Sequence, residues 1–168
     1  MVRPDGFEDA GMERLFRQHY LELVRLASLW TENTVEAEDV VQDAFANLEL
    51  SGVSSPLPFL RTVVANRARS AARRKKSERR AINNLASASP SRVGALEDSL
   101  ATFDRALMLS IRRLPDRQQD VLILRFYLDW STERTAQELG ISVSAVRSST
   151  HRALQSLKIW MARDTDEH

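Results

Sequence analysis

A run of basic residues near the middle of the chain could bind phosphate groups. From Ala65 to Arg80 the sequence reads ANRARSAARRKKSERR, in which Glu78 is the one acid. Guanidinium and ammonium groups neutralise nucleic-acid phosphates and release their counterions, so such binding depends on salt. The other interpretation is a solvated helix face, because an exposed charged helix carries the same side chains. The run alone leaves both interpretations open.

The sequence offers little support for catalytic chemistry. The chain has no cysteine, which excludes disulfides and cysteine-based zinc sites. It also lacks a glycine loop of the kind that cradles phosphate and a nucleophile beside a base. We therefore expect no catalytic residue, no metal and no cofactor. An enzyme acting on nucleic acid is the weakest of the functions considered.

Composition favours a helical protein of ordinary size. The chain has 168 residues, of which 43% are hydrophobic, enough to build a packed core. With 5 glycines and 5 prolines it has few of the residues that separate strands. No apolar run approaches the roughly 18 residues that span a bilayer, and the N-terminus lacks the apolar centre of a signal peptide. We expect a soluble, cytoplasmic protein with no membrane insertion.

Charge is divided into blocks along the chain, although the formal net charge is only +1. Between Thr31 and Leu50 no lysine or arginine occurs, and the acids are Glu32, Glu36, Glu38, Asp39, Asp43 and Glu49. The basic run follows with the opposite sign. Blocks of this kind suggest separate faces for separate partners.

Apolar spacing predicts the helices of the first half. Residues recur at intervals of three and four over Met12–Trp30 and again over Val35–Glu49, with Thr34 as the expected N-cap of the second helix. The segment Ser51–Pro58 (SGVSSPLP) is expected to be a loop. A third helix should begin near Pro58 or Phe59 and continue into the basic run.

The second half should form a separate helical domain. The segment Ala86–Gly94 (ASASPSRVG) is small and polar, which is typical of a linker. Helices are expected over Leu100–Leu114 and Asp116–Leu128. The predicted fold is all-α, with domains at 10–82 and 100–163 joined by a flexible linker at 83–99.

A helix-turn-helix is the most specific pattern in the chain. A short helix over Thr132–Leu139 should end at Gly140, and a second should run from Ser142 or Ser144 to about Ala162. A small Ala136, the turn glycine and a β-branched Val146 have the spacing that this motif requires. The expected core residues of the second helix are Val146, Thr150, Ala153, Leu154 and Leu157. Its outer face would carry Ser144, Ala145, Arg147, Ser148, His151 and Arg152. A plain helix pair with an idle surface is the alternative.

Two blocks of the sequence resemble a known family. The first contains AEDVVQDAF (Ala37–Phe45) and PFLRTVVANRARSAARRKK, and the second is LPDRQQDVLILRFYLDWSTERTAQELGISVSAVRSSTHRALQSL. In this order around a variable linker, they are similar to bacterial RNA polymerase sigma factors. The compact layout resembles the extracytoplasmic-function (ECF, group 4) branch of the sigma-70 family. The resemblance covers roughly Glu13 to Met161.

The resemblance implies a sigma factor that binds core RNA polymerase, directs it to promoters through −10 and −35 elements and helps melt the DNA. Its polymerase contacts would be the clamp helices of the largest subunit and the β flap. An anti-sigma protein is a common partner in the family, although no residue here identifies one. The residues implied at the clamp helices are Asp39, Gln42 and Asp43. Those implied at the −10 element are Ser54, Ser55, Asn66, Arg67, Arg73, Arg74, Lys75 and Lys76. Those implied at the −35 element are Ser144, Arg147, Ser148, His151 and Arg152.

The competing hypothesis is a stand-alone helix-turn-helix repressor or activator that binds a palindrome as a dimer. It accounts for the second half of the chain but leaves the acidic helix and the basic run without a role. The chain also departs from the family pattern at Ser70, where members often carry aspartate.

Overall fold

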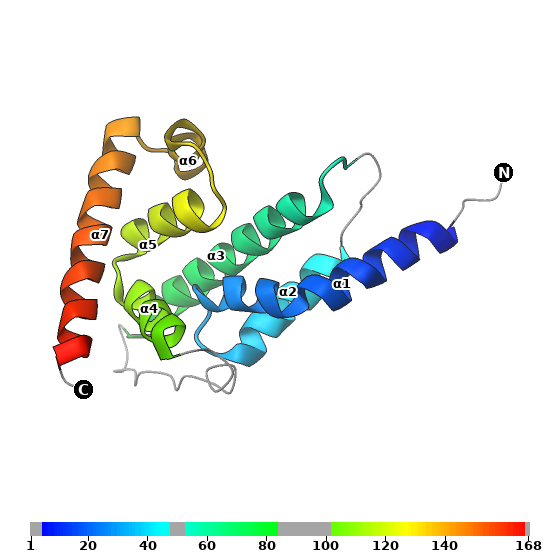
Figure 1. The fold of residues 1–168 in the computed structure, drawn as a ribbon, viewed down its shortest axis with the longest axis horizontal. Helices are drawn as coiled ribbons and strands as arrows, with labels where there is room; N and C mark the ends of the chain where they lie inside the picture. The colour runs from blue at the N-terminus through cyan, green and yellow to red at the C-terminus, as the bar shows by residue number, and fades with distance from the viewer. Residues whose placement is uncertain (1–4, 48–52, 84–101, 167–168) are drawn as a thin grey trace. The chain divides into compact units, whose positions relative to one another are not determined.

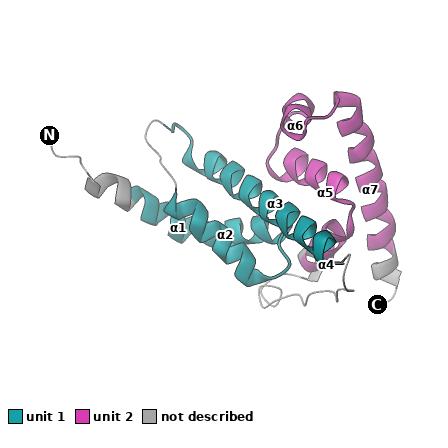
Figure 2. Cartoon of the chain, turned by 180° about the vertical axis from the view of Figure 1, so that it is seen from behind, with its two compact units in different colours: residues 1–96 teal, residues 97–168 magenta. Residues whose placement is uncertain are grey.

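The computed structural model describes residues 5–47, 53–83 and 102–166. These ranges contain helices and no strands, and the chain divides into two compact units, Met1–Leu96 and Glu97–His168 (Figure 2). The predicted all-α class with two small helical domains is confirmed. The expected linker Ala86–Gly94 and the expected helix end at Glu49 lie outside the described residues.

Unit 1 is built from the helices α1 (Asp5–Ser28), α2 (Thr34–Ala46) and α3 (Pro56–Asn83), which pack on one another (Figure 1). Each buries an apolar stripe, as the spacing of its apolar residues predicts. The buried residues include Leu23, Val24, Leu26 and Ala27 of α1, Val41 and Ala44 of α2, and Leu60, Val64 and Ala68 of α3. The stripe of α3 ends at Ala68, well before the helix does.

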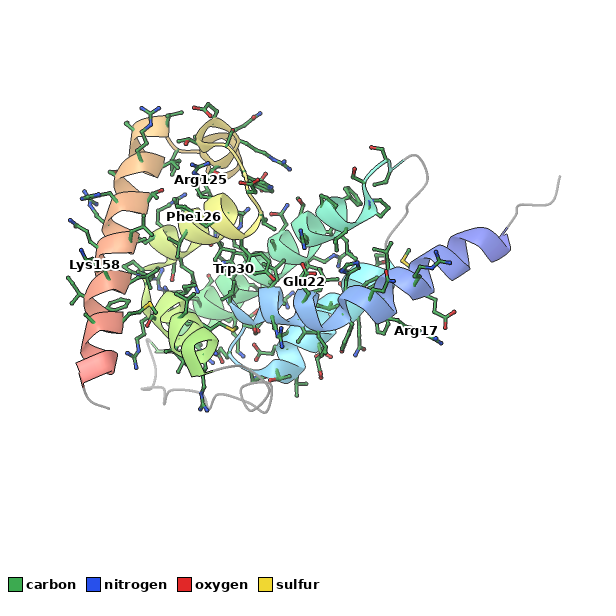
Figure 3. The ribbon with its side chains drawn as sticks, in the orientation of Figure 1. Arg17, Glu22, Trp30, Arg125, Phe126 and Lys158 are labelled. Carbon is green, nitrogen blue, oxygen red and sulfur yellow. The ribbon has the colours of Figure 1, made fainter. Side chains whose placement is uncertain are left out.

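An ion pair also joins α1 to α3. The Arg61 Nε atom donates to Glu22 Oε1 at 2.6 Å, and His19 Nδ1 lies 3.3 Å from the other oxygen of Glu22, which is labelled in Figure 3. These side chains are about one-third exposed or less. The pair lies in the half of α3 that precedes the basic run.

Asn33, and not the predicted Thr34, caps the start of α2. Its backbone is extended, with φ −146°, and its side-chain oxygen accepts the backbone N–H of Glu36 at 3.0 Å. Thr34 is therefore already the first helical residue. Asparagine and threonine both cap helices well, so residue type alone could not choose between neighbours.

The helix α3 begins two residues before the predicted start, inside the segment expected to be a loop. Pro56 and Pro58 both lie in its first turn. Proline is compatible with this position because the first N–H groups of a helix have no partner within the helix. The prolines that suggested a loop therefore belong to the helix start.

Unit 2 contains α4 (Thr102–Arg113), α5 (Asp116–Leu122), α6 (Thr132–Leu139) and α7 (Val143–Asp166). A π-helical turn, Ile123–Tyr127, replaces the end of the single helix predicted over Asp116–Leu128. There the Leu128 N–H donates to the carbonyl of Ile123 at 3.1 Å, five residues back. Asp129 then adopts φ 54°, which ends the helical path.

The predicted helix-turn-helix is confirmed. Gly140 lies between α6 and α7 in the left-handed region, with φ 62°, and the Ile141 N–H donates to the Ala136 carbonyl at 3.0 Å. Ala136, Val121 and Val146 form a buried cluster between the helices. Small Ala136 permits the approach and Val146 anchors the second helix, as the spacing predicts.

Leu154, however, is not a core residue, because it is 46% exposed. The neighbouring Ala153 and Leu157 are buried against Leu114 and Leu122. Successive helical residues point about 100° apart, so a residue next to the buried stripe can face solvent.

Within the described ranges no helix combines the length and apolar character needed to cross a membrane.

Gly11 and Gly140 give a test with opposite signs. Gly140 has φ 62° and Gly11 lies within α1, and a Cβ at either would meet no atom within 4 Å. We expect Gly140→Ala to lower the free energy of unfolding of unit 2 by about 1 kcal/mol, because left-handed backbone strains alanine. Gly11→Ala should instead stabilise unit 1 by about 0.5–1 kcal/mol. Hydrogen exchange measures each unit separately, and two changes of the same sign would contradict this expectation.

Candidate nucleic-acid interface

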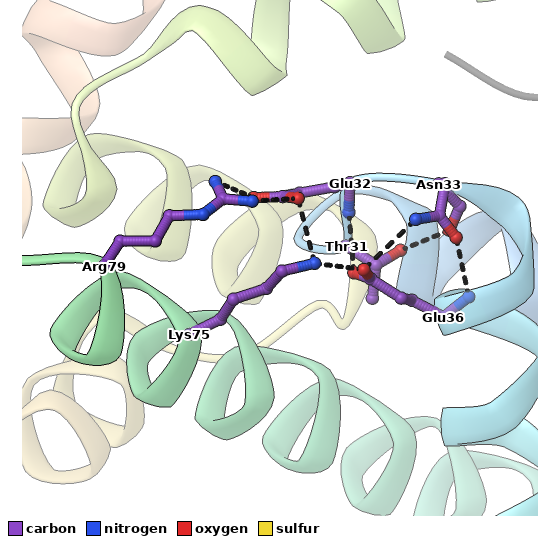
Figure 4. A network of polar contacts seen from close by, with 6 residues as sticks. All are labelled: Thr31, Glu32, Asn33, Glu36, Lys75 and Arg79. Carbon is purple, nitrogen blue, oxygen red and sulfur yellow. Dashed lines mark hydrogen bonds and ion pairs between the residues drawn. The ribbon is translucent and has the colours of Figure 1, made fainter. Parts of the chain in front are cut away.

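The basic run of α3 meets the acidic residues that precede and begin α2 (Figure 4). Lys75 Nζ lies 2.9 Å from Glu32 Oε2 and also contacts Glu36 Oε1. Arg79 binds the same Glu32 through both terminal nitrogens, with Nη2 donating to Oε2 at 2.6 Å. Lys75 and Arg79 lie four residues apart on one side of α3, and both reach the acids at the start of α2, Glu32 before the helix and Glu36 in its first turn.

Glu36 also belongs to the cap of α2. Its carboxylate accepts the Asn33 side-chain amide at 3.1 Å and the backbone N–H of Glu32 at 3.2 Å. The carboxylate that holds Lys75 is thus fixed by the start of its own helix. A pre-positioned acceptor loses less conformational freedom on pairing than a mobile surface carboxylate would.

These contacts change the acid–base behaviour of the cluster. Burial disfavours the ionised form of Glu32, but its bonds to Arg79 and Lys75 outweigh burial and lower its pKa below the ordinary 4.5. The bonds of Lys75 to Glu36 and Glu32 raise the pKa of Lys75 above its ordinary 10.5. Both groups therefore remain charged at neutral pH.

A further ion pair joins the other end of α2 to the start of the basic run. Arg67 Nη1 contacts Asp43 Oδ2, and the two side chains are 36% and 59% exposed. The pairing is antiparallel, because Glu32 and Glu36 meet the far part of α3 whereas Asp43 meets its earlier part. The predicted polymerase contact Asp43 and the predicted DNA contact Arg67 are thus bound to each other.

A hollow of about 560 Å³ lies between these ion pairs. Asp39 and Asp43 of α2 line one side, and Asn66, Ser70 and Arg74 of α3 line the other. The small side chain of Ser70 leaves this part of the interface unfilled. In the part of the chain that the structure describes, the buried Oδ1 of Asn66 has no hydrogen-bond partner. Asn66 therefore lines the hollow while its own Oδ1 stays buried.

The remaining cations of the run lie on exposed parts of α3. Arg73, Arg74, Lys76 and Arg80 are exposed, whereas Lys75 and Arg79 are half-buried. Arg74 lies 3.7 Å from Glu78 on its own helix. The run therefore has a side that faces α2 and a side that faces solvent.

This arrangement corrects the expectation that the acidic and basic blocks form separate faces for separate partners. A large part of each block faces the other, across the contact between α2 and α3. The sequence carried a weak signal of this pairing, since Glu32 and Glu36 have the same four-residue spacing as Lys75 and Arg79. Only the approach of two helices distant in sequence reveals the pairing.

The other predicted contacts of unit 1 are accessible. Asp39 and Gln42 lie exposed on α2. Ser54 and Ser55 are exposed just before α3, and the Ser55 carbonyl accepts the N–H of Phe59 at 3.3 Å. The two serines lie in a different segment from the hollow that contains Asn66.

In unit 2 the residues predicted to read DNA share the exposed side of the first turns of α7: Ser144, Arg147, Ser148, His151 and Arg152. Their turn begins at Ser142, whose hydroxyl accepts the Ala145 N–H at 3.1 Å and contacts the Ser144 hydroxyl at 2.9 Å. Across the described residues, Arg147 and Arg152 take part in no ion pair. Two cations are therefore available on this surface.

A further cation, Arg134, lies on the neighbouring helix α6 and was not among the residues predicted from the sequence. The Arg134 guanidinium of α6 lies 4.1 Å from the ring centre of Trp130, in a cation–π contact. Trp130 is buried, so this contact restricts the flexible side chain of Arg134 on α6, which is the first helix of the motif. A spacing of four residues predicts contact between side chains on one helix. Trp130 precedes α6, so the spacing of Trp130 and Arg134 was only a weak signal of their contact.

Comparison with known proteins decides the family. A family model described as "Sigma-70 region 2" matches residues 15–78, and one described as "Sigma-70, region 4" matches residues 104–157. An RNA polymerase sigma-E factor from Streptomyces avermitilis is 32% identical over 152 residues, which cover 86% of this chain and 82% of that protein. The chain is a sigma factor of the sigma-70 family. The resemblance to its ECF branch is confirmed as well.

Other relatives agree with this sigma-factor assignment. The RNA polymerase sigma factor CarQ from Myxococcus xanthus is 29% identical over 159 residues, covering 92% of this chain and 90% of that one. The ECF sigma factor ShbA from Streptomyces griseus is 39% identical over 70 residues, 37% of each chain. The sigma factor RpoE from Bartonella quintana, solved with the anti-sigma factor NepR, has the same fold. Its TM-score is 0.58, at 22% identity over 89% of this chain and 95% of that one.

Family membership establishes the general role of the protein. Sigma factors are transcription initiation factors that act with RNA polymerase at promoters, and catalysis is not their role. The region 2 match includes the α2–α3 interface, and the region 4 match includes the helix-turn-helix.

The lowered pKa of Glu32 gives unit 1 a defined dependence on acid. A depressed folded-state pKa contributes stability that is present above the unfolded pKa, near 4.5, and is lost as pH falls through the folded pKa. We expect Glu32→Gln to lower the thermal midpoint of unit 1 at pH 7 by a few degrees and to flatten the decline of that midpoint as pH falls below about 4.5. Thermal unfolding monitored by hydrogen exchange measures both.

The matched control is Glu13→Gln, because the ion pair of Glu13 with Arg17 stays within α1 and both side chains are well exposed, 62% and 77%. This variant should leave the acid limb unchanged. Equal flattening by the two variants would show that the α2–α3 ion pairs do not carry the effect.

Proposed function

We propose that this sigma factor directs core RNA polymerase to promoters with −10 and −35 elements and helps open the DNA between them. Residues 10–82 would act at the polymerase and the −10 element, and residues 100–163 at the −35 element, joined by a linker over 83–99. The observation that carries the proposal is the helix-turn-helix surface of α7. There the basic and hydroxyl side chains lie together, exposed, where a recognition helix enters the major groove.

The exposed acidic side of α2 supports docking on the polymerase. Asp39, Gln42 and Asp43 are accessible there, and an acidic surface complements a basic one on the clamp helices of the largest subunit. In unit 2, Phe126 and Tyr127 of the π-helical turn are 59% and 38% exposed. We assign this apolar pair to the β flap, because exposed aromatic residues are enriched at protein interfaces.

The hollow between α2 and α3 supports capture of DNA near the −10 element. Asn66 supplies an unsatisfied acceptor there. A rotation of the Asn66 side chain would bring this buried oxygen to an extruded base, whose exocyclic amine could then donate to it. Such a bond would offset part of the unstacking cost of roughly 1–2 kcal/mol per base-pair step. Ser54 and Ser55 are proposed to contact the same DNA segment from the start of α3. Arg67, Arg73, Arg74 and Lys76 would contact the backbone.

Reconstituted transcription tests the proposal. The protein is added to sigma-free core polymerase with a library of random-sequence DNA, and bound fragments are selected and transcribed. We expect enrichment of a bipartite sequence and initiation at a fixed distance from it. A dimer that binds a palindrome tightly without polymerase, and supports no initiation, would instead establish the stand-alone repressor or activator.

Charge reversal at Asp39 tests the docking surface. Asp39→Arg places like charges against a basic partner, and we expect core-polymerase affinity to fall about tenfold or more. Glu13→Arg is the control, because it reverses an exposed acid on α1 outside the proposed surface. Binding of labelled protein to core polymerase measures both. Unchanged affinity for Asp39→Arg would remove α2 from the docking surface.

Truncation at Arg147 tests the −35 surface. We expect Arg147→Ala to weaken binding of the holoenzyme to the −35 sequence by about 1–3 kcal/mol and to relax specificity there. Core-polymerase affinity should not change. Lys158→Ala removes an exposed cation farther along α7 and serves as the control (Figure 3). If both variants weaken all sequences equally, Arg147 acts as a phosphate contact and does not read bases.

A further inference from the structure

Arg134 occupies a position in α6 where the local preferences of a helix disfavour a cation. Ser131 caps this helix, and its hydroxyl accepts the Arg134 backbone N–H at 3.0 Å, so Arg134 is the third helical residue. At this position glutamate or glutamine completes a capping box, since its side chain can reach the N–H of the cap residue. The N-terminal end of the helix dipole also favours anions over cations. Two local preferences therefore oppose an arginine here.

A second arginine binds α6 at the end where a cation is favourable. The Arg117 Nη1 atom, from α5, donates to the Leu139 carbonyl at 3.1 Å, at the C-terminal end of α6. The last carbonyls of a helix have no partner within it, and the helix dipole is negative there. The stability of α6 thus explains Arg117 but does not explain Arg134.

Trp130 gives Arg134 a rigid support. The guanidinium lies 4.1 Å from the ring centre, and Trp130 is only 4% exposed. The backbone of Trp130 is bound on both sides, because its N–H donates to the Leu124 carbonyl at 3.1 Å and its carbonyl accepts the Arg125 guanidinium. The π-helical turn therefore fixes the ring, and the ring restricts the arginine above it.

This support leaves the hydrogen-bonding capacity of Arg134 unused. The residue is exposed, and across the described residues its guanidinium takes part in no ion pair and no hydrogen bond. A cation–π contact uses the face of the ring and takes up no acceptor, so the N–H donors of the guanidinium remain available. Two of these donors can bind one phosphate at the same time. Arg134 is also the one cation of α6.

The place of α6 in the motif indicates which phosphates these donors could meet. The helix packs against α7 and lies beside its start, where the residues predicted to read DNA are exposed (Figure 1, Figure 2). When the second helix of a helix-turn-helix enters the major groove, the first helix crosses the DNA backbone. A cation on the exposed side of α6 would then lie at the backbone that borders the groove.

We infer that Arg134, held on Trp130, is a further DNA contact that binds a backbone phosphate beside the groove occupied by α7. The inference rests on the proposed function and deepens it, because it adds a contact from α6 to the reading residues of α7. A phosphate contact fixes the orientation of the motif on the duplex and carries no base preference of its own. The arginine thus favours DNA binding at a position where another residue would favour the helix.

Arg134→Met and Arg117→Met form a matched test, because each removes one exposed arginine from an end of α6. A third variant, Arg134→Glu, introduces the residue that completes the capping box. Each variant is assembled with core polymerase on a promoter fragment that the wild-type holoenzyme has selected, and on the same fragment with its −35 sequence replaced. Affinity is measured over a series of salt concentrations, and the thermal midpoint of unit 2 in each free protein is measured by hydrogen exchange.

We expect Arg134→Met to reduce the slope of log affinity against log salt by about 1 on both fragments, because one phosphate contact is lost. Its thermal midpoint should stay close to that of the wild type, since loss of the cation–π contact and relief of the unfavourable dipole oppose each other. Arg117→Met should keep the wild-type slope and lower the midpoint by about 2–5 °C. Arg134→Glu should weaken DNA binding more than Arg134→Met does, without lowering the midpoint.

An unchanged slope for Arg134→Met would overturn the inference. A loss of affinity confined to the intact −35 sequence would also overturn it, because Arg134 would then read a base. Failure of the proposed function is distinguishable: the wild-type holoenzyme would select and transcribe no promoter fragment, and the inference would fall with it. The inference fails alone when wild-type initiation is normal and Arg134→Met keeps the wild-type slope.

Discussion

The ion pairing between α2 and α3 is the interaction on which the surfaces of unit 1 depend. Apolar packing holds α3 only as far as Ala68, and about four more turns follow before the helix ends. Those turns carry too much charge to be buried. Glu32 and Glu36 supply the counter-charges that keep the segment beside α2, and the N-cap of α2 fixes one of these acids in place.

The ion pairing between α2 and α3 also connects the two surfaces proposed for polymerase and for DNA. Asp43 and Arg67 bind each other, and both border the hollow that contains Asn66. The proposed polymerase contacts and the proposed base-binding contacts are therefore neighbours on one interface between helices. A shift of α2 caused by docking would be transmitted directly to the residues around Asn66, since packed helices move as rigid elements.

The elements that local residues determine could be predicted from the sequence. The helix-turn-helix was predicted because Ala136, Gly140 and Val146 each meet a steric requirement within a short segment. The apolar stripes of α1 and α2 were predicted from the three- and four-residue spacing of their apolar residues. The N-cap was misplaced by one residue, since Asn33 and Thr34 are both good caps. Two prolines obscured the start of α3.

Features that depend on tertiary contacts could not be predicted in this way. The pairing of Lys75 with Glu32 and Glu36 joins segments about forty residues apart, and sequence blocks of charge do not show which helix faces which. The π-helical turn begins at the buried residues Ile123 and Leu124, where the apolar spacing predicted an ordinary helix. Leu154 was wrongly assigned to the core. The width of the buried stripe of α7 depends on the helices that pack against it, which the spacing along α7 does not show.

The internal compensation of charge also shapes the electric field of the protein in solution. Lys75 and Arg79 are balanced by adjacent acids, and the chain as a whole carries a formal charge of only +1. At distances beyond a Debye length, about 8 Å in physiological salt, such paired charges cancel and little attraction toward bulk DNA remains. Free molecules would therefore spend little time on the vast excess of non-specific DNA in a cell. Under the proposed function, they would remain available to polymerase, and binding to polymerase would bring the exposed cations of α3 within reach of a promoter.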